Sequence, residues 1–221
     1  STRVLEGKTV VITAGPTREA IDPVRYISNY SSGKMGYALA QAAADAGAKT
    51  ILISGPTALK TPDHVRRIDV MSADEMFQAS MDAVYKSTNS CDIFIASAAV
   101  ADFKPVAIAL HKIKKNNQNS MTLEMVKNPD IVASIAALAN APFTVGFAAE
   151  TQQLLENAKS KLSKKQLDLV IANDVSNSDI GFDSDNNAFT IVTKNDVFIM
   201  SQKSKKQLAV DIISYIATYI D

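Results

Sequence analysis

Short apolar runs alternate along this chain with longer segments in which apolar residues recur every three or four positions. Runs of about four to eight residues between turn-forming residues are typical of strands that are buried on both faces. The runs predicted as strands span residues 9–13, 49–54, 65–70, 92–96, 143–147 and 167–172.

The segments between these runs have the spacing of amphipathic helices. Ser72 and Glu75 form a capping box at one helix start, and the sequence SSGKMG (31–36) opens an alanine-rich helix. At another start Asn128 is predicted as the N-cap, Pro129 as the first helical residue and Asp130 as an acid matched to the helix dipole. The positions expected to face the core are Met76, Phe77, Met81 and Val84, then Ile131, Ile135 and Leu138, then Leu154, Leu155, Ala158 and Leu162, and finally Leu208, Ile212, Ile216 and Tyr219.

This alternation predicts an α/β fold, a Rossmann-like open and mostly parallel sheet with helices on both faces. Residues 188–192 and 197–201 flank the turn segment 193–196 and predict a C-terminal antiparallel hairpin. We expect the 221 residues to form a single domain, residues 1–221.

The first strand and the loops that follow it have the pattern of an anion site. The strand ends in the small residues 14–17, and the glycine-containing segment 31–36 leads into a helix. Backbone N–H groups converge at such a helix start, and the helix dipole favours negative charge there. The sequence therefore predicts a phosphate site, although Gly33 and Gly36 could instead serve only close packing of the helix on the sheet.

Two familiar nucleotide motifs are excluded. Gly15 and Gly33 are separated by residues 16–32, which is far too long for the tight dinucleotide fingerprint. Met35 follows Gly33 and Lys34, so the Ser or Thr of a P-loop is missing.

Composition narrows the function further. The formal net charge is zero and the pI is near 6.7, so binding to bulk nucleic acid is not expected. No apolar run approaches the roughly eighteen residues of a membrane span, and the sole cysteine, Cys91, fits a cytoplasmic protein. The two histidines, His64 and His111, lack the spacing of a zinc site, so metal ligands within the chain are not expected. The remaining mode of catalysis is one in which the protein positions the reacting groups and neutralises their charge.

Small or polar residues follow several of the predicted strands, at the edge where parallel sheets bind ligands. They are residues 14–17, 54–56, 97–99 with Asp102, 148–151 and 173–174, although loops are rich in such residues in any case. Two lysine groups, residues 112–115 and 159–165, are candidate cations for a triphosphate or are simply solvated surface charges. The lysines at 203, 205 and 206 are expected to be surface charges.

Six segments together resemble one family closely, and the similarity spans nearly the whole chain. They are ITAGPTREAIDPVRYISNYSSGKMG, AAVADFKP, KIKK, VKNPDI, VGFAAET and ANDV. The resemblance is to the bacterial phosphopantothenoylcysteine synthetases of coenzyme A biosynthesis. It implies a ligase in which 4'-phosphopantothenate attacks CTP, releases pyrophosphate and forms an acyl-cytidylate, which L-cysteine then converts to the amide with release of CMP.

The resemblance also implies roles for individual residues. Asn29 and Lys112 are the implied catalytic residues, and Lys112 lies on an implied mobile flap at about residues 103–120. This chain departs from the family in one respect, because the flap between Lys115 and Met121 is short and asparagine-rich. Arg25 matches an arginine near the subunit interface. The residues implied for 4'-phosphopantothenate are Gly15, Asn29, Ser31, Gly33, Gly36, Ala98, Ala99 and Asp102. The residues implied for CTP are Ala96, Ser97, Ala98, Asp102, Lys112, Pro129, Asp130, Ile131, Val132, Phe147, Lys161 and Lys165.

The same resemblance implies Mg²⁺ or Mn²⁺ accompanying CTP, no tightly bound cofactor in this domain, and a homodimer without nucleic-acid or membrane partners. It also implies that this chain is one half of a protein whose upstream half is a flavin-dependent decarboxylase. Two other classes stay open, a dinucleotide-dependent oxidoreductase and a non-catalytic nucleotide-binding module. The first predicts an acid after the second strand, where Ser54, Gly55 and Pro56 stand instead.

Overall fold

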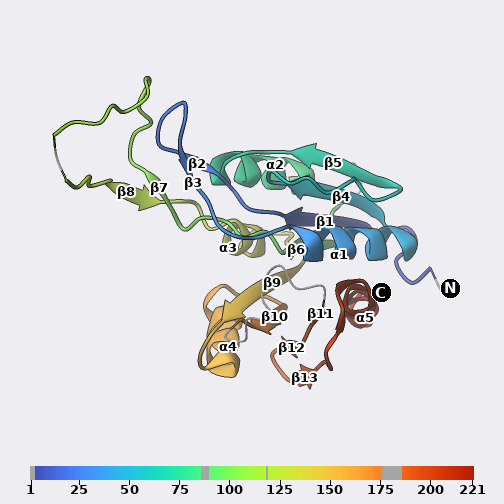
Figure 1. The fold of residues 1–221 in the computed structure, drawn as a ribbon. Coiled ribbons are helices and arrows are strands. Elements are labelled where there is room, and N and C mark those ends of the chain that lie inside the picture. The colour runs from blue at the N-terminus through green and yellow to red at the C-terminus, as the bar shows by residue number, and fades with distance from the viewer. Residues whose placement is uncertain (1–2, 86–89, 118, 176–185) are drawn as a thin grey trace.

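The computed structural model describes residues 3–85, 90–117, 119–175 and 186–221. Within these residues, eight strands form one sheet in the order β13-β12-β10-β9-β6-β1-β4-β5 (Figure 1). The strands from β10 to β5 run parallel, and β12 and β13 are antiparallel. Their bounds are β1 (Thr9–Ala14), β4 (Lys49–Ser54), β5 (Val65–Asp69), β6 (Ile93–Ala96), β9 (Phe143–Glu150), β10 (Leu169–Asp174), β12 (Phe189–Val192) and β13 (Val197–Ile199). The predicted α/β fold and its C-terminal hairpin are confirmed.

Helices cover both faces of the sheet because successive apolar side chains along each strand point to opposite faces. In β1, Val10 and Ile12 pack toward α1 (Lys34–Asp45) and α5 (Lys205–Ala217), whereas Val11 packs on the opposite side. That opposite side is covered by α2 (Ala73–Tyr85), α3 (Ile131–Ala136) and α4 (Leu154–Lys164). In the described part of the chain, no helix is long and apolar enough to cross a membrane.

The order of strands reverses at β1. The chain moves outward from β1 to β4 and β5, and then returns to the other side of β1 to form β6 and β9. The loops that leave β1 and β6 therefore diverge and open a crevice at the carboxyl ends of these strands. Ligands of open α/β sheets bind in such crevices.

Two hairpins project from this edge of the sheet on the same side of the molecule (Figure 1). The short hairpin contains β2 (Glu19–Ala20) and β3 (Tyr26–Ile27). The second, which we name the long arm, is residues 103–127, with β7 (Phe103–Pro105) and β8 (Met125–Lys127) at its base. The long arm contains the predicted flap, of which residue 118 lies outside the described residues. The remaining short pair is β11 (Asn186–Asn187) with β14 (Lys203–Ser204), just before α5.

Asp22 ties the short hairpin to the long arm. Its buried carboxylate accepts hydrogen bonds from the amides of Val24 and Arg25 at 2.8 Å and from the Ile113 amide at 3.0 Å. The Arg25 guanidinium donates to the same carboxylate and, at 2.7 Å, to the Ile113 carbonyl oxygen. The bonds from the Ile113 amide and from Arg25 hold the pKa of Asp22 well below its usual range. The hairpin thus fixes the position of the arm one residue from Lys112.

Two details of the predicted helices are wrong. The N-cap of α3 is Asp130 rather than Asn128, because the Asp130 carboxylate accepts from the Ala133 amide at 3.2 Å, which places Pro129 before the helix. The Asn128 side chain instead donates to the Ala101 carbonyl oxygen at 2.8 Å. Leu138 and Tyr219 lie two residues beyond the ends of α3 and α5, although Leu138 still packs against the core as expected, and Leu155 is exposed.

Candidate functional site

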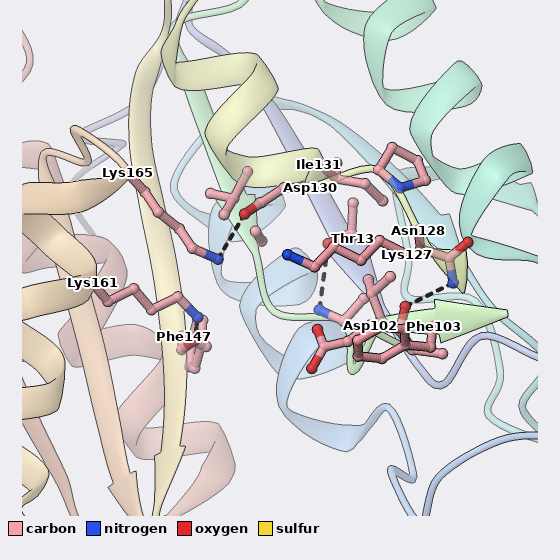
Figure 2. A pocket seen from close by; sticks show the side chains of 16 residues that line it. Thr13, Asp102, Phe103, Lys127, Asn128, Asp130, Ile131, Phe147, Lys161 and Lys165 are labelled. Carbon is pink, nitrogen blue, oxygen red and sulfur yellow. Dashed lines mark hydrogen bonds and ion pairs between the residues drawn. The ribbon is translucent and has the colours of Figure 1, made fainter. Parts of the chain in front are cut away.

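Two cavities lie next to each other beyond the carboxyl ends of β1 and β6. The first, which we name the lysine pocket, has a volume of about 460 Å³ (Figure 2). The second, which we name the glycine pocket, has a volume of about 430 Å³. The two cavities share a wall formed by Ala98, Val100, Asp102 and Phe147. Ligands bound in the two pockets would therefore meet at this wall.

Three lysines, Lys127, Lys161 and Lys165, line the lysine pocket. Lys161 and Lys165, at the end of α4, extend toward the cavity from one side (Figure 2). The Lys161 ammonium donates to the Phe147 carbonyl oxygen, and the Lys165 ammonium pairs with the Asp130 carboxylate at 2.9 Å. Burial, and then the nearby charge of Lys165, lower the pKa of Lys161. An anionic ligand would offset both effects, so this pocket favours a polyanion.

Backbone contacts hold the opposite wall of the lysine pocket in place. The Ala98 amide donates to Thr13 Oγ1 at 3.3 Å, and Asn128 bonds to the Ala101 carbonyl oxygen (Figure 2). The Asn128 amide also donates to the Asp102 carbonyl oxygen at 2.8 Å. The loop after β6 is thereby fixed to β1 and to the segment before α3. These contacts fix the backbone of Asp102 at the wall that the two pockets share.

The glycine pocket is built around the start of α1. Gly33 is the N-cap residue, and its φ of 82° is a conformation that favours glycine. Gly33 has no side chain that could cap this helix, and the Ser32 hydroxyl oxygen accepts a hydrogen bond from the Lys34 amide at 3.3 Å. At Gly36 a Cβ atom would lie 2.4 Å from Ala14 Cβ and 2.6 Å from Ser97 Oγ. Close packing on β1 therefore explains Gly36, whereas the helix start at Gly33 fits an anion site.

Asn29 is held at the entrance to this loop by its own hydrogen bonds. Its side-chain amide donates to the Ala99 carbonyl oxygen at 2.8 Å, and its carbonyl oxygen accepts from the Ser31 amide at 3.1 Å. The side chain thus bridges the loop after β1 and the loop after β6. One hydrogen of the amide is used at Ala99, and the second hydrogen can be donated to another acceptor.

The structure brings most of the predicted site residues to the two pockets. Of the set expected for 4'-phosphopantothenate, the glycine pocket contains Ser31, Gly33, Gly36, Ala98, Ala99 and Asp102. Of the set expected for CTP, the lysine pocket contains Ala96, Ala98, Asp102, Pro129, Asp130, Ile131, Val132, Phe147, Lys161 and Lys165, whereas Ser97 lines the glycine pocket.

The other predicted residues lie at the edge of the site. Gly15 packs beneath Gly33, where a Cβ on Gly33 would lie 3.3 Å from Gly15 Cα. Lys112 is exposed on the long arm and lines neither pocket. Arg25 lies next to it through its bond to the Ile113 carbonyl oxygen.

Sequence reasoning was wrong about Lys205. The chain pattern predicts a surface lysine at a helix start, but the Lys205 side chain is buried and lines the glycine pocket. Asn173, which follows the buried strand β10, lines the same pocket together with Phe189. In the sequence, the position of Asn173 at the end of a predicted strand indicated a pocket residue. A lysine close to other lysines, by contrast, gives no indication that it is buried.

Other chemistries have no support in the described residues. Cys91 is buried, and burial raises the pKa of its thiol to about 12, so it does not form a thiolate nucleophile near neutral pH. Within the described ranges there is no group of three or more His, Cys, Asp or Glu side chains that could hold a metal ion.

Comparisons with known proteins agree with this geometry. A family model described as the DNA/pantothenate metabolism flavoprotein C-terminal domain matches residues 5–220. The coenzyme A biosynthesis bifunctional protein CoaBC of Vibrio parahaemolyticus is 55% identical over 96% of this chain, but only 52% of that protein is matched. The chain therefore spans about half the length of the curated relatives it matches.

Solved structures share the fold. The crystal structure of the C-terminal domain of a CoaBC protein superposes with a TM-score of 0.83 at 36% identity, covering 99% of this chain and 98% of that one. A Cab2 mutant in complex with phosphopantothenate-cysteine superposes with a TM-score of 0.77 over 96% of this chain and 87% of that one. At 18% identity, this second likeness concerns the fold alone.

Proposed function

Because the chain belongs to the DNA/pantothenate metabolism flavoprotein C-terminal domain family, we propose that it is a ligase joining 4'-phosphopantothenate to L-cysteine. The co-substrate is CTP, which is cleaved to CMP and pyrophosphate. The observation that supports this proposal best is the wall shared by the two pockets, since it lets an acid in one pocket meet a nucleotide in the other.

The lysine pocket is the proposed site of CTP. Lys161 and Lys165 supply positive charge to the triphosphate, and Asp130, which pairs with Lys165, keeps that ammonium group at the cavity until the nucleotide arrives. Mg²⁺ or Mn²⁺ enters with the triphosphate as part of the substrate.

The glycine pocket is the proposed site of 4'-phosphopantothenate. The start of α1 favours an anionic group, and the apolar side chains of Met35, Phe147 and Phe189 suit an aliphatic chain. With the acid placed in this way, its carboxylate lies at the shared wall near Ala98 and Asp102. A carboxylate oxygen attacks the α-phosphorus of CTP there, and pyrophosphate leaves with the electron pair of the broken P–O bond.

Asn29 and Lys112 have separate roles in the proposal. The ammonium group of Lys112 neutralises the α-phosphate and the departing pyrophosphate when the long arm closes over the lysine pocket. Asn29 donates its second amide hydrogen to the acyl oxygen as the cysteine amine attacks and CMP departs. In the structure the contacts of Asp22 and Arg25 with Ile113 hold the arm against the short hairpin.

The two projecting hairpins are the proposed surface for a second copy of the chain. The hairpins lie on one side of the molecule (Figure 1), and both contain exposed large apolar side chains. These residues include Val24 (60% exposed), Tyr26 (50%), Val106 (57%), Ile108 (61%) and Leu110 (87%). Contiguous exposed apolar side chains are typical of protein interfaces. A homodimer formed here would place the interface next to the active site, through Arg25 and the long arm.

A pyrophosphate-release assay tests the proposed function. The protein should release pyrophosphate when 4'-phosphopantothenate and CTP are both supplied, and should form CMP and the amide only when cysteine is added. Release in a single turnover without cysteine, with an acyl-cytidylate visible by mass spectrometry, would support the two-step order. Binding of CTP with no pyrophosphate release would show a nucleotide-binding module instead.

A further inference from the structure

Lys127 is a third lysine of the lysine pocket, and the proposed reaction leaves it without a role. It is the last residue of β8 and therefore ends the long arm, and it belongs to neither of the lysine groups that stand out in the sequence. Figure 2 shows its side chain extending into the cavity toward Lys161 and Lys165, from the opposite side. Three ammonium groups therefore face this cavity, from two different parts of the chain.

The backbone of Lys127 is held in place on both sides. Lys127 pairs with Phe103 at the base of the long arm. The next residue, Asn128, donates from its backbone amide to the Asp102 carbonyl oxygen and from its side chain to the Ala101 carbonyl oxygen, both at 2.8 Å. These contacts fix the Cα atom of Lys127 next to the loop after β6, which contributes to the wall shared by the two pockets. The side chain thus extends into the cavity from a fixed point.

The Lys127 ammonium group differs from the other two in its contacts. Lys161 donates to the Phe147 carbonyl oxygen, and Lys165 pairs with the Asp130 carboxylate. Among the residues that the structure describes, none forms a hydrogen bond or an ion pair with the ammonium group of Lys127. Since Lys127 is exposed, water solvates this group in the ligand-free protein. A phosphate can therefore replace that water without breaking a contact within the protein.

Lys127 also decides the net charge of the lysine pocket. The charged side chains that line the pocket are Asp102, Lys127, Asp130, Lys161 and Lys165. The two carboxylates balance the charge of two lysines, so the pocket carries an excess of positive charge only because of the third. Such an excess attracts a polyanion. A neutral residue in place of Lys127 would leave the proposed triphosphate site without net charge.

We infer that Lys127 binds the β- and γ-phosphates of the nucleotide, the part that departs as pyrophosphate. This inference rests on the proposed function, which places the attacked α-phosphorus at the wall shared by the two pockets. Lys127 lines the lysine pocket but not the glycine pocket, so it faces a part of the nucleotide that lies away from the acid. Its ammonium group stays protonated throughout. Pyrophosphate takes the electron pair of the broken P–O bond, and Lys127 stabilises the negative charge that develops on it.

The cytidine is the other part of CTP that lies away from the acid, and the composition of the pocket favours it less as the partner of Lys127. Cytosine and ribose carry no negative charge, whereas phosphate oxygens accept charge-assisted hydrogen bonds from an ammonium group. Pro129, Ile131 and Val132 contribute apolar surface to the same lining, which suits the base. The phosphates are therefore the part of the nucleotide that Lys127 should contact.

The test compares Lys127→Met with the control Lys104→Met by calorimetric titration in the presence of Mg²⁺. Lys104 lies on β7 at the same base of the arm, pairs with Asp74 and lines neither pocket. Lys127→Met should weaken binding of CTP and of pyrophosphate about tenfold, the lower end of the range for a hydrogen bond to a charged group, because the side chain is exposed. Binding of CMP should change less than about twofold. Lys127→Arg, which keeps the positive charge, should bind both ligands within about threefold of wild type. Lys104→Met should behave as wild type.

Four results would overturn the inference. Two of them are unchanged binding of CTP and pyrophosphate by Lys127→Met, and an equal loss for CMP, which would place Lys127 at the nucleoside end. The other two are an equal loss in Lys104→Met, which would show an effect of the arm base alone, and an equal loss in Lys127→Arg, which would exclude the charge as the cause. If Lys127→Met fails to fold, Lys127→Gln in the same titrations decides the question. Failure of the proposed function is distinguishable, because wild type would then bind CTP without releasing pyrophosphate in the presence of 4'-phosphopantothenate.

Discussion

Replacing Asn29 with aspartate should separate the two half-reactions. The two side chains have nearly the same size, so the loop between β1 and α1 should keep its course. Asn29→Asp removes the NH₂ donor and leaves a group that only accepts hydrogen bonds. In the native structure this donor bonds to the Ala99 carbonyl oxygen at 2.8 Å and has a second hydrogen for the acyl oxygen. The substitution therefore changes one structural and one catalytic contact.

The expected magnitudes differ between the steps. Loss of the neutral bond to Ala99 costs about 1 kcal/mol, and since residue 29 is exposed, water can solvate the new carboxylate. Cytidylate formation should therefore slow by about tenfold or less. The second step also loses an oxyanion donor, which is worth about 2.7–4 kcal/mol, and should slow by about 10²- to 10³-fold. The acyl-cytidylate should accumulate.

Rapid-quench mass spectrometry with CTP, 4'-phosphopantothenate and cysteine measures both steps at once. Asn29→Asp should show a trapped acyl-cytidylate that wild type consumes quickly. Tyr30→Phe is the matched control, because the Tyr30 side chain is 93% exposed and should have no role in either step. Normal product formation by Asn29→Asp, or no cytidylate at all, would refute the reasoning.

Three further outcomes are expected. Lys112→Gln should slow single-turnover pyrophosphate release at least tenfold, whereas the control Lys115→Gln, also on the exposed arm, should not. If Lys112→Gln released pyrophosphate at the wild-type rate, Lys112 would have no role in the first step. Sedimentation at micromolar concentration should show a dimer that Leu110→Glu weakens, and a fully active wild-type monomer would disprove the interface. Lys161→Met should weaken CTP binding yet raise the melting temperature at pH 7, because burial lowers the pKa of Lys161 and so its charge destabilises the folded state. That stabilisation should shrink as pH rises toward 10.5, the ordinary lysine pKa, and Lys159→Met should show no such trend.

The strands and the start of α1 could be predicted from the sequence because local patterns specify them. Between residues 9 and 13, three consecutive β-branched apolar residues stand between two threonines, a pattern that is typical of a strand buried on both faces. The segment 31–36 was interpretable because glycine and small polar residues at a helix start have few other uses. The convergence of strand ends was likewise predictable, since it follows from parallel topology.

What could not be predicted depends on contacts between distant parts of the chain. Asn128 and Asp130 are both good N-cap residues, and the choice between them is made by the Ala101 carbonyl oxygen, which takes the Asn128 side chain. The pairing of Asp22 with Ile113 joins residues 91 positions apart. Lys205 lines a pocket together with residues from the start of α1, which is distant in the sequence. No local pattern contains such information.

The packing of α5 on α1 affects how the domain folds during synthesis. Its last helix completes the core face that its first helix begins, and the same helix brings Lys205 to the glycine pocket. Contacts between such distant segments form late and slow folding, because a long loop must close before they form. A nascent chain lacking α5 would therefore expose the apolar side of α1 and have an incomplete pocket. Synthesis of the final residues should thus be the moment at which the domain gains both its stability and its affinity for the acid.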